Sequence, residues 1–422
     1  MKGDVKVAAW LLALSLFAQF TMLGGDGAFL GMICAVLNCT TGLLLITIAR
    51  PQTRFYTHLL LPFFLFGAGL VWSLWPDIGG RAVSERIAPD LVPTELARML
   101  GYGVLLAGTA SLGYRRGPTR YSSELICLAG ALNLLIGLLL SQLDKTHIWG
   151  LAKGIQAARF SGTMLNANAM GTVFGVVALL ALGAALVHLR EGKGSKPFHE
   201  LWLCVFLVIF TGTLGGVGLT GSRTAFVVCL LGSATLLLYH WLATRKQAGN
   251  GITSMIWLGV LLLNLLVAGG YAAMQRMQGL AGDAVSRTEL WRHFGTLAER
   301  AGPHGFGLGS FSEINTALLP VHDLATDLWY INSAHNIVLQ MIIEGGLLFP
   351  ALMFAGLIPI MIAIWRGRPD SLTGRIVLLA CVLGLGVIIA GGMVDVALNI
   401  PAVVSLAAAL VGLLWGRSVR YR

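Results

Sequence analysis

Residues 167–188 read ANAMGTVFGVVALLALGAALVH and contain no Asp, Glu, Lys or Arg. A stretch of this length and apolarity crosses the hydrocarbon core of a membrane as one helix. In the whole chain of 422 residues, hydrophobic residues make up 56% and charged residues 11%. Too few polar side chains remain to cover a soluble protein of this size, and disordered and disulfide-rich secreted classes are excluded as well. The sequence therefore predicts an all-α polytopic membrane protein.

Working outward from this segment, about 12 stretches are long and apolar enough to span a membrane. They are Val5–Leu23, Ala28–Ala49, Thr57–Trp75, Leu96–Tyr114, Ser123–Ser141, Ala167–His188, Leu201–Leu219, Thr224–Leu242, Ile252–Ala273, Leu347–Trp365, Ile376–Val394 and Ile400–Trp415. The first is not a cleaved signal peptide, because it lacks a small-residue cleavage site and a second span follows at once.

The net charge of +10 is explained by membrane orientation. With the N-terminus in the cytoplasm, most Lys and Arg residues fall in cytoplasmic loops and tails, as the positive-inside rule requires, so no nucleic-acid partner is needed. Both termini are then cytoplasmic. The chain divides into nine spans over 1–273, a large periplasmic loop over 274–346, and three spans with a cytoplasmic tail over 347–422. Two smaller outer loops cover 76–95 and 142–166.

Polar residues are concentrated in the outer loops, which predicts that any chemistry takes place on the outer face. Charge in the middle of the membrane is nearly absent. Asp395 lies near the outer end of the eleventh span, where we expect it to reach water. Ion-coupled transporters usually carry ionisable residues at the midplane, so this scarcity disfavours a transporter.

The first candidate site is Gly221-Ser222-Arg223-Thr224, at the outer start of the eighth span. Ser222 is a suitable helix cap, and the free N–H groups of a helix start favour a phosphate. Arg223 in the first turn would add a bidentate donor. The alternative is that Arg223 only extends to the lipid interface.

Two further arginines lie on the same predicted face. Arg287 stands in Ser286–Trp291, which predicts a helix start, and it would bind the same anion or pair with a nearby acid. Arg159 opens the segment Arg159–Asn168, which leads into the sixth span, where a polar residue such as Asn168 is also typical of a helix cap. Surface positions are expected for Arg276, Arg292 and Arg300.

The segment His304–Ser310 has glycines at 305, 307 and 309. Alternating glycines let the backbone approach a ligand closely, so Gly307 and Gly309 are predicted to contact the substrate. The same spacing also forms an ordinary flexible turn, and without a preceding strand it is a weak sign of a nucleotide site.

The most informative segment is Asn332–Gly346, NSAHNIVLQMIIEGG. Asn332 or Ser333 is predicted to cap a helix that the glycine pair ends. His335 would then lie in the first turn, where the helix dipole favours a neutral imidazole able to accept a proton. Asn336 beside it is a candidate substrate contact. The alternative is a capping or buried, hydrogen-bonded histidine.

Metal ligation is not expected from this pattern. The other loop histidines are His293, His304 and His322, and none forms an HxH or HxxxH spacing. All six cysteines fall within spans and lack metal-ligand spacing. We therefore expect neither a metal nor a cofactor.

Five motifs follow one another in order between residues 159 and 346. They are R-x-x-G-T-x-x-N-x-N at 159–168, G-S-R-T at 221–224, R-x-x-L-W at 287–291, G-x-G-x-G-S-F at 305–311 and H-N-x-x-L-x-x-x-x-E-G-G at 335–346. Together with a large outer loop between the ninth and tenth spans, they resemble the O-antigen ligase and O-antigen polymerase superfamily.

The resemblance implies a GT-C-type glycosyltransferase of the bacterial inner membrane that moves a glycan from undecaprenyl diphosphate to an acceptor on the periplasmic side, without metal or nucleotide sugar. Arg223 and Arg287 would hold the donor diphosphate, and Arg159 would assist them. His335 would deprotonate the acceptor hydroxyl for attack with inversion. Ser222, Asn168, Asn336, Gly307 and Gly309 would line the substrate site.

Ligation of O-antigen to lipid A-core is the first expectation, because the chain is compact and ends in a short basic tail after its last span. The alternatives within the superfamily are an O-antigen polymerase and a protein O-oligosaccharyltransferase. From another class, the alternative is a transporter or flippase of a lipid-linked sugar or an anion, in which the outer arginines would attract the substrate.

Overall fold

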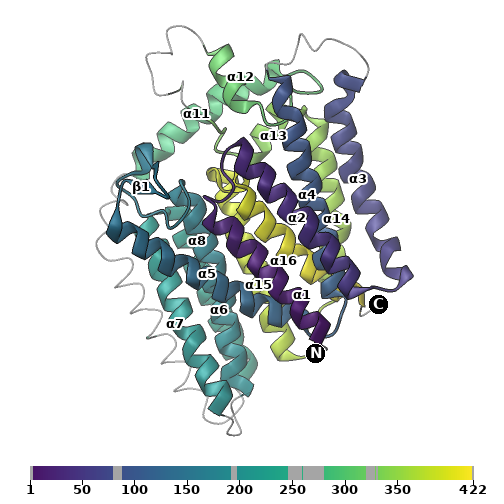
Figure 1. Cartoon of the computed structure of the whole chain (residues 1–422), viewed down its shortest axis with the longest axis vertical. Coiled ribbons are helices and arrows are strands. Elements are labelled where there is room, and N and C mark those ends of the chain that lie inside the picture. Colours follow the sequence, from purple (N-terminus) through teal and green to yellow (C-terminus); the bar gives the residue numbers. More distant parts are fainter. Residues whose placement is uncertain are drawn as a thin grey trace.

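The computed structural model describes residues 3–78, 88–191, 197–245, 280–319 and 331–420, together with 259 and 328 (Figure 1). Long apolar helices dominate this part of the chain. They are α1 (Gly3–Thr21), α2 (Ala28–Ala49), α3 (Thr53–Ile78), α4 (Val92–Gly113), α5 (Pro118–Leu143), α6 (Ala167–Glu191), α7 (Pro197–Thr220), α8 (Arg223–Thr244), α14 (Leu348–Arg366), α15 (Leu372–Val394) and α16 (Pro401–Arg420).

Within the described residues, 11 helices are long and apolar enough to cross a membrane. Each corresponds to one of the predicted spans, and α2 has the predicted bounds. The remaining predicted span, Ile252–Ala273, lies outside the described residues. The prediction of an all-α polytopic membrane protein is confirmed.

Helix α6 forms the centre of one half of the protein. It packs against α5, α7, α8 and α15, and every residue of its most apolar window is buried. A helix that is surrounded on all sides needs apolar residues on all faces, which explains why this segment has no polar stripe.

A second group of helices, α2, α4 and α16, packs beside α1. Glycines allow α2 and α4 to touch through their backbones, since a Cβ on Gly108 would lie 2.5 Å from the carbonyl oxygen of Gly42. Buried polar side chains also join these helices. Gln19 donates to Asn38 over 2.9 Å, and Asn38 donates to Ser405 over 2.8 Å.

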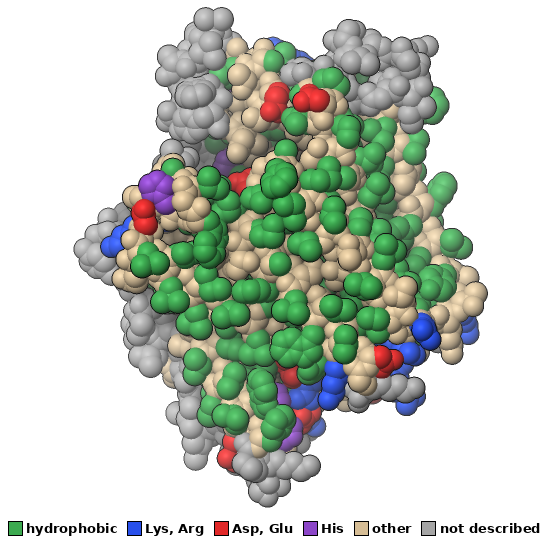
Figure 2. Space-filling view, in the orientation of Figure 1, with side chains coloured by type: hydrophobic (Ala, Val, Ile, Leu, Met, Phe, Trp, Pro, Cys, Tyr) green, Lys and Arg blue, Asp and Glu red, His purple; other side chains and the backbone are tan. Residues whose placement is uncertain are grey.

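The two ends of the bundle differ. Both termini lie at one end, and elements that are not candidate membrane spans lie toward the other (Figure 1). These are the hairpin of β1 (His147–Ile148) and β2 (Leu151–Ala152), and the helices α11 (Leu280–Arg300), α12 (Phe311–Leu318) and α13 (Ile337–Gly345). Figure 2 shows hydrophobic side chains over the middle of the visible face and most of its Lys and Arg near the end with the termini. We call the end that carries α11–α13 the outer end.

The three helices of the outer end share a small core of their own. It contains the buried side chains of Phe294, Leu297, Phe311, Ile314, Ala334 and Ile343. The rings of Phe294 on α11 and Phe311 on α12 meet edge to face at 5.0 Å. This core fixes α13, and with it the segment that precedes α13, against the ends of the membrane helices.

Two predicted helix starts are wrong. Helix α11 begins at Leu280, before the expected start at Ser286. Helix α13 begins at Ile337 with Asn336 as its cap, so His335 precedes the helix and does not lie in its first turn. His335 therefore lacks the first-turn position on which the predicted effect of the helix dipole depended. The glycine pair does end α13, as predicted.

Candidate functional site

The backbone around His335 is held in an unusual conformation. His335 has a φ of 50°, in the left-handed region, whereas Asn336 is extended. For a residue with a side chain, this region costs about 1–2 kcal/mol. The Oδ1 atom of Asn336 accepts from the backbone N–H of Leu339 over 3.1 Å, and its Nδ2 donates to the carbonyl of Met393 over 3.1 Å. Asn336 therefore ties this turn both to the first turn of α13 and to the end of α15.

Three amide and hydroxyl side chains brace this turn. Asn399, in the short helix η6 (Ala397–Asn399), donates to Ser333 and, over 2.7 Å, to the Oε1 atom of Gln340. The same Oε1 accepts from the backbone N–H of Ala334. Ser333, which we expected to be a possible cap, is thus bound to the junction between α15 and α16. These bonds offset the strain at His335.

His335 faces Asp395, the residue that follows α15. The Nδ1 atom of His335 lies 3.6 Å from the Oδ1 atom of Asp395. The Asp395 side chain is 7% exposed and that of His335 is 30% exposed. We expected Asp395 to reach water, and this is wrong because the residue is buried. The distance is too long for a hydrogen bond, and it places the Asp395 carboxylate on the Nδ1 side of the imidazole.

A chain of short hydrogen bonds extends from Asp395 to Arg159. Asn168 in the first turn of α6 donates to Asp395 over 2.5 Å, and Arg159 donates to Asn168 over 2.5 Å. Arg159 also donates twice to the carbonyl of Thr220, over 3.0 and 2.8 Å. Thr220 is the last residue of α7 and stands three residues before Arg223. Two of the predicted arginine segments and His335 therefore belong to one connected region.

The spacing of the two asparagines before α6 has a structural reason. The Oδ1 atom of Asn166 accepts from the N–H groups of Asn168 and Ala169, over 2.9 and 3.0 Å. Asn166 thus caps the helix, and Asn168 extends from the first turn to Asp395 and Arg159. We predicted Asn168 as a substrate contact or a cap. Each of its two polar atoms has a protein partner, and a contact with the substrate stays a prediction.

The segment around Arg223 forms the predicted helix start. Arg223 is the first residue of α8 and Ser222 stands at the cap position, but the Ser222 hydroxyl makes no capping hydrogen bond. A Cβ on Gly171 would lie 2.7 Å from the Cβ of Ser222, so this turn packs closely on α6, one turn after Asn168. Close packing explains why small residues precede Arg223.

Of the remaining predicted arginines, the structure describes the side chains of Arg292 and Arg300 but not those of Arg287 and Arg276. Arg287 lies in α11, which packs against α13, but its side chain is outside the described part of the chain. Arg292 and Arg300 are exposed, as expected. Arg276 lies outside the described residues. Convergence of Arg287 with His335 therefore stays a prediction.

The glycine turn has a protein partner. The backbone N–H of Gly307 donates to the carbonyl of Glu344 over 2.9 Å, and that of Gly309 donates to the Glu344 carboxylate over 3.0 Å. A Cβ on Gly305 would lie 2.4 Å from the Glu344 carbonyl oxygen. The glycines allow close approach, as predicted, but to the end of α13. The Gly307 and Gly309 N–H groups are therefore occupied by the protein itself.

Glu344 is a buried acid beside the site. It accepts from Gln340 over 3.1 Å, and Gln340 in turn holds the turn before His335. Burial and, to a smaller extent, the carboxylate of Glu95 raise the pKa of Glu344 to about 8. Glu344 is thus largely protonated at neutral pH, which suits a structural hydrogen bond better than a charge.

Residues 202–354 match the O-antigen ligase family (Wzy_C). The match runs from α7 to the first part of α14. It contains Arg223, Arg287, Gly307, Gly309 and His335. It confirms the resemblance to O-antigen ligases and polymerases over this part of the chain. No curated protein matches the chain.

The O-antigen ligase match does not include the partners that connect its residues. Arg159 and Asn168 precede it, and Asp395 and Asn399 follow it. The fold brings the ends of α6 and α15 to the matched segment before α13. The matched region therefore depends on helices on both sides of it.

Sequence reasoning missed Asp395, Gln340 and Asn399 as parts of the site. The signal for Asp395 was its position as an isolated acid at the end of an apolar span, followed by Asn399 four residues later. By its position in the sequence alone, Asp395 was considered only as a possible charge within the membrane. Gln340 lies one turn after the cap of α13, and its role became visible only with its partners in place.

The loop histidines give no metal cluster in the described part of the site. The ring of His304 lies 4.2 Å from that of Trp72 with a tilt of 35°, and its Nδ1 contacts the Trp72 carbonyl. His293 lies edge to face with Phe294. His322 lies outside the described residues. Both described rings have structural partners, as expected.

Proposed function

We propose that the chain is an O-antigen ligase that transfers a glycan from undecaprenyl diphosphate to a sugar hydroxyl of lipid A-core. The O-antigen ligase match supports a function of the ligase and polymerase type. The observation that carries the finer proposal is the chain of contacts from His335 through Asp395 and Asn168 to Arg159. It joins a candidate base to a candidate anion site.

His335 is the proposed general base. Its Nε2 would take the proton of the acceptor hydroxyl while the hydroxyl oxygen attacks the anomeric carbon. The bond between that carbon and the phosphate oxygen breaks, and undecaprenyl diphosphate leaves with the electron pair, so the configuration inverts. Asp395 would hold Nδ1 protonated and stabilise the imidazolium that forms.

Arg223 and Arg287 are the proposed diphosphate ligands, and Arg159 would assist them. Positive charge held near the leaving oxygen stabilises the charge that develops there in the transition state. In this proposal the arginines take the role that a divalent cation has in other phosphate enzymes. Arg159 would act mainly by positioning, because it donates three bonds to Asn168 and Thr220.

The other predicted contacts have protein partners, and this supports positioning roles. Asn168, Asn336, Gly307 and Gly309 would shape the site for the substrate without binding it through these atoms. Ser222 remains a proposed substrate contact beside Arg223.

We place the enzyme in the bacterial inner membrane with the outer end in the periplasm and both termini in the cytoplasm. It would be of the GT-C type, with region 274–346 supplying His335 and Arg287 between the spans of 1–273 and 347–422. The region 347–422 would supply Asp395. The concentration of basic residues near the termini supports this orientation.

The test uses the purified chain in detergent with EDTA, lipid-linked O-antigen and lipid A-core. We expect O-antigen joined to lipid A-core on a gel from the wild type, and none from His335→Ala. A lengthened donor glycan without joined product would indicate a polymerase, and transfer only to an added acceptor protein would indicate an oligosaccharyltransferase. Movement of intact lipid-linked sugar across vesicles, unaffected by His335→Ala, would indicate a transporter and overturn the proposal.

A further inference from the structure

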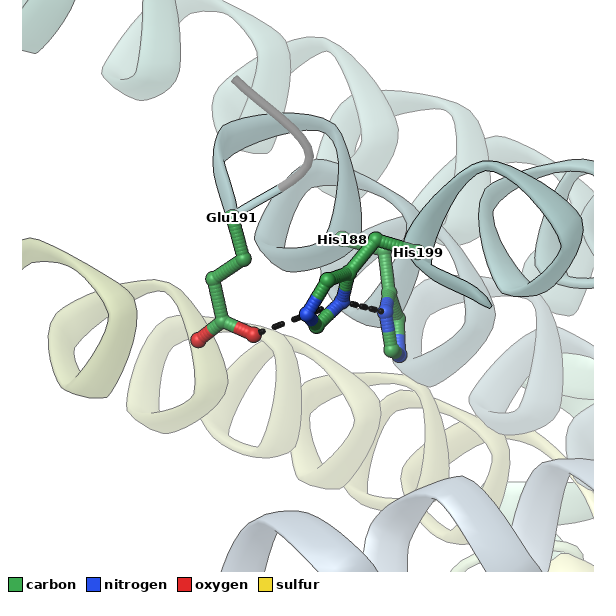
Figure 3. A group of neighbouring side chains, drawn as sticks. All are labelled: His188, Glu191 and His199. Atoms are coloured by element: carbon green, nitrogen blue, oxygen red, sulfur yellow. Dashed lines mark hydrogen bonds and ion pairs between the residues drawn. The ribbon is translucent and has the colours of Figure 1, made fainter. Parts of the chain in front are cut away.

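A second cluster of ligating side chains lies at the end of α6 opposite Asn168. His188 and Glu191 come from the last turn of α6, and His199 comes from the first turn of α7. Figure 3 shows the three side chains facing one another. Their ligating atoms all lie within 4.8 Å of one another, and no other group of three or more such residues occurs in the described chain.

The distances fit a single small metal ion. The Nδ1 atoms of His188 and His199 are 3.1 Å apart, and the Nδ1 of His199 is 3.8 Å from Oε2 of Glu191. Zinc binds imidazole and carboxylate at about 2.0–2.2 Å in tetrahedral geometry, which separates its ligand atoms by roughly 3.3 Å. The two histidine separations lie on either side of this value, and the atoms of His188 and Glu191 lie within 4.8 Å of each other.

The His188 ring is held with Nδ1 toward the cluster. Its Nε2 lies 3.3 Å from the carboxylate of Glu124 on α5, and the ring stacks on Phe206 at 5.5 Å. A carboxylate at Nε2 keeps the proton there and leaves the lone pair on Nδ1, as in carboxylate–histidine–zinc arrangements. Arg120 Nη2 also lies near Nε2, at 3.5 Å, and is the weaker contact.

Glu191 is oriented in the same way by a neighbour. Its Oε1 atom accepts from Arg120 over 2.6 Å, which leaves Oε2 on the side of His199. Arg120 also pairs with Glu124 over 2.7 Å. One guanidinium therefore pairs with two carboxylates, which fixes Glu124 behind His188 and Glu191 beside His199.

We propose that His188, Glu191 and His199 bind a divalent transition-metal ion of the zinc class. Two imidazoles and one carboxylate are the ligand set that suits this class, with one position left for water. The ion would tie the end of α6 to the start of α7. The other ends of these helices carry Asn168 and Thr220, so the ion would stabilise the pair of helices that positions Arg159. It takes no part in glycosyl transfer.

The test is metal binding by the full chain in detergent, purified with a tag that lacks histidine, stripped with EDTA and dialysed. Co²⁺ is the spectroscopic probe, and Zn²⁺ is the competitor. We expect about one Co²⁺ per chain, with visible absorption of the intensity typical of four-coordinate sites, displaced by Zn²⁺. This measurement on the wild type needs no variant to fold.

Variants then identify the ligands. His199→Gln and Glu191→Gln, both partly exposed, should weaken binding at least tenfold and abolish the absorption. Glu124→Gln keeps all three ligands but loses the carboxylate behind His188, so affinity should fall by about 10–100-fold. His147→Gln, an exposed histidine at the outer end, is the matched control and should bind as the wild type does.

Two results would overturn the proposal. One is a wild type that binds neither Co²⁺ nor Zn²⁺ above a detergent blank, which would mean that the two imidazoles only share a proton. The other is a His199→Gln protein that binds as tightly as the His147→Gln control. Glycan transfer plays no part in either readout, so the outcome is independent of the proposed ligase activity.

Discussion

His335 and Asp395 meet at 3.6 Å although α13, α14 and α15 separate them along the chain. The contact depends on the left-handed backbone of His335 and on the end of α15, where Asp395 follows Val394. It pairs a partly exposed imidazole with a buried carboxylate. In the proposed mechanism, Asp395 would orient the base His335.

Asp395→Asn tests this pairing. The amide has the same shape but lacks the charge that would stabilise the imidazolium. We expect kcat to fall at least tenfold, but by less than the roughly 10²–10⁴-fold that general-base catalysis contributes and that His335→Ala should lose. The measurement is the rate of O-antigen transfer, and Asp144→Asn, an exposed outer acid, should leave it unchanged.

The double variant His335→Ala with Asp395→Asn decides whether the two residues act together. If Asp395 works through His335, the double variant should be no slower than His335→Ala alone, because effects within one unit are not additive. Multiplied losses would show that Asp395 acts elsewhere.

Arg159→Lys tests the connection to Thr220 and Asn168. Lysine keeps the charge but cannot form the three bonds that the planar guanidinium donates. Bonds from a charged donor contribute about 1.5–3 kcal/mol each. We expect kcat/KM for transfer to fall about tenfold or more, whereas Arg292→Lys on the exposed face of α11 should have no effect. Equal activity of both variants would mean that charge alone matters at this position.

Glu344 predicts a pH dependence of stability. Burial raises its pKa from 4.5 to about 8, so between these values the carboxyl is protonated in the folded state and ionised in the unfolded state. The folded state then binds the extra proton, and the free energy of unfolding falls as pH rises through this window. Above the pKa of Glu344 in the folded state, its contribution to the free energy of unfolding is fully lost.

Glu344→Gln should therefore flatten the fall of the thermal midpoint between pH 5 and pH 8, roughly the interval that these pKa values span. The measurement is thermal unfolding in detergent across this range. Glu299→Gln on the exposed side of α11 should keep the wild-type slope. If the thermal midpoint of Glu344→Gln fell with pH as steeply as that of the wild type, the pH dependence would come from other groups.

Gly305→Ala tests the close approach of the glycine turn to α13. The change strains a φ of 73° and places a Cβ 2.4 Å from the Glu344 carbonyl. We expect a loss of about 2–5 kcal/mol in stability from strain and overpacking together. Gly302→Ala is the matched control, since its φ is 65° but nothing lies within 4 Å of its Cβ.

The control should therefore lose only the backbone term, about 1–2 kcal/mol. The two thermal midpoints, measured in the same detergent, give the packing cost by difference. Equal losses would mean that the turn moves away from α13 without penalty and does not brace it.

Much of this protein was predictable from local sequence. The absence of charge over 167–188 predicted the central helix α6, and Gly221–Thr224 predicted the start of α8. The order of five motifs indicated the family that residues 202–354 match. These features depend on the composition of one segment and on residues close together in the chain, so the segment itself contains the information that specifies them.

The start of α13 shows where local reasoning fails. Asn332, Ser333 and Asn336 are all good helix caps. Asn399, from the far side of α14 and α15, binds Ser333, and this leaves Asn336 to cap the helix. The residue that caps α13 was therefore decided by a hydrogen bond from a side chain distant in the sequence.

The sequence by itself determined the membrane spans, the concentration of polar residues in the outer loops and the identity of the candidate base and arginines. Tertiary structure decided that Asp395 and Asn168 connect His335 to Arg159, that the glycine turn binds α13, and that His188, Glu191 and His199 meet. The physical reason is that hydrophobicity acts through the composition of each segment, whereas these polar contacts form between side chains on different helices. Only the packing of the helix ends sets the distances between them.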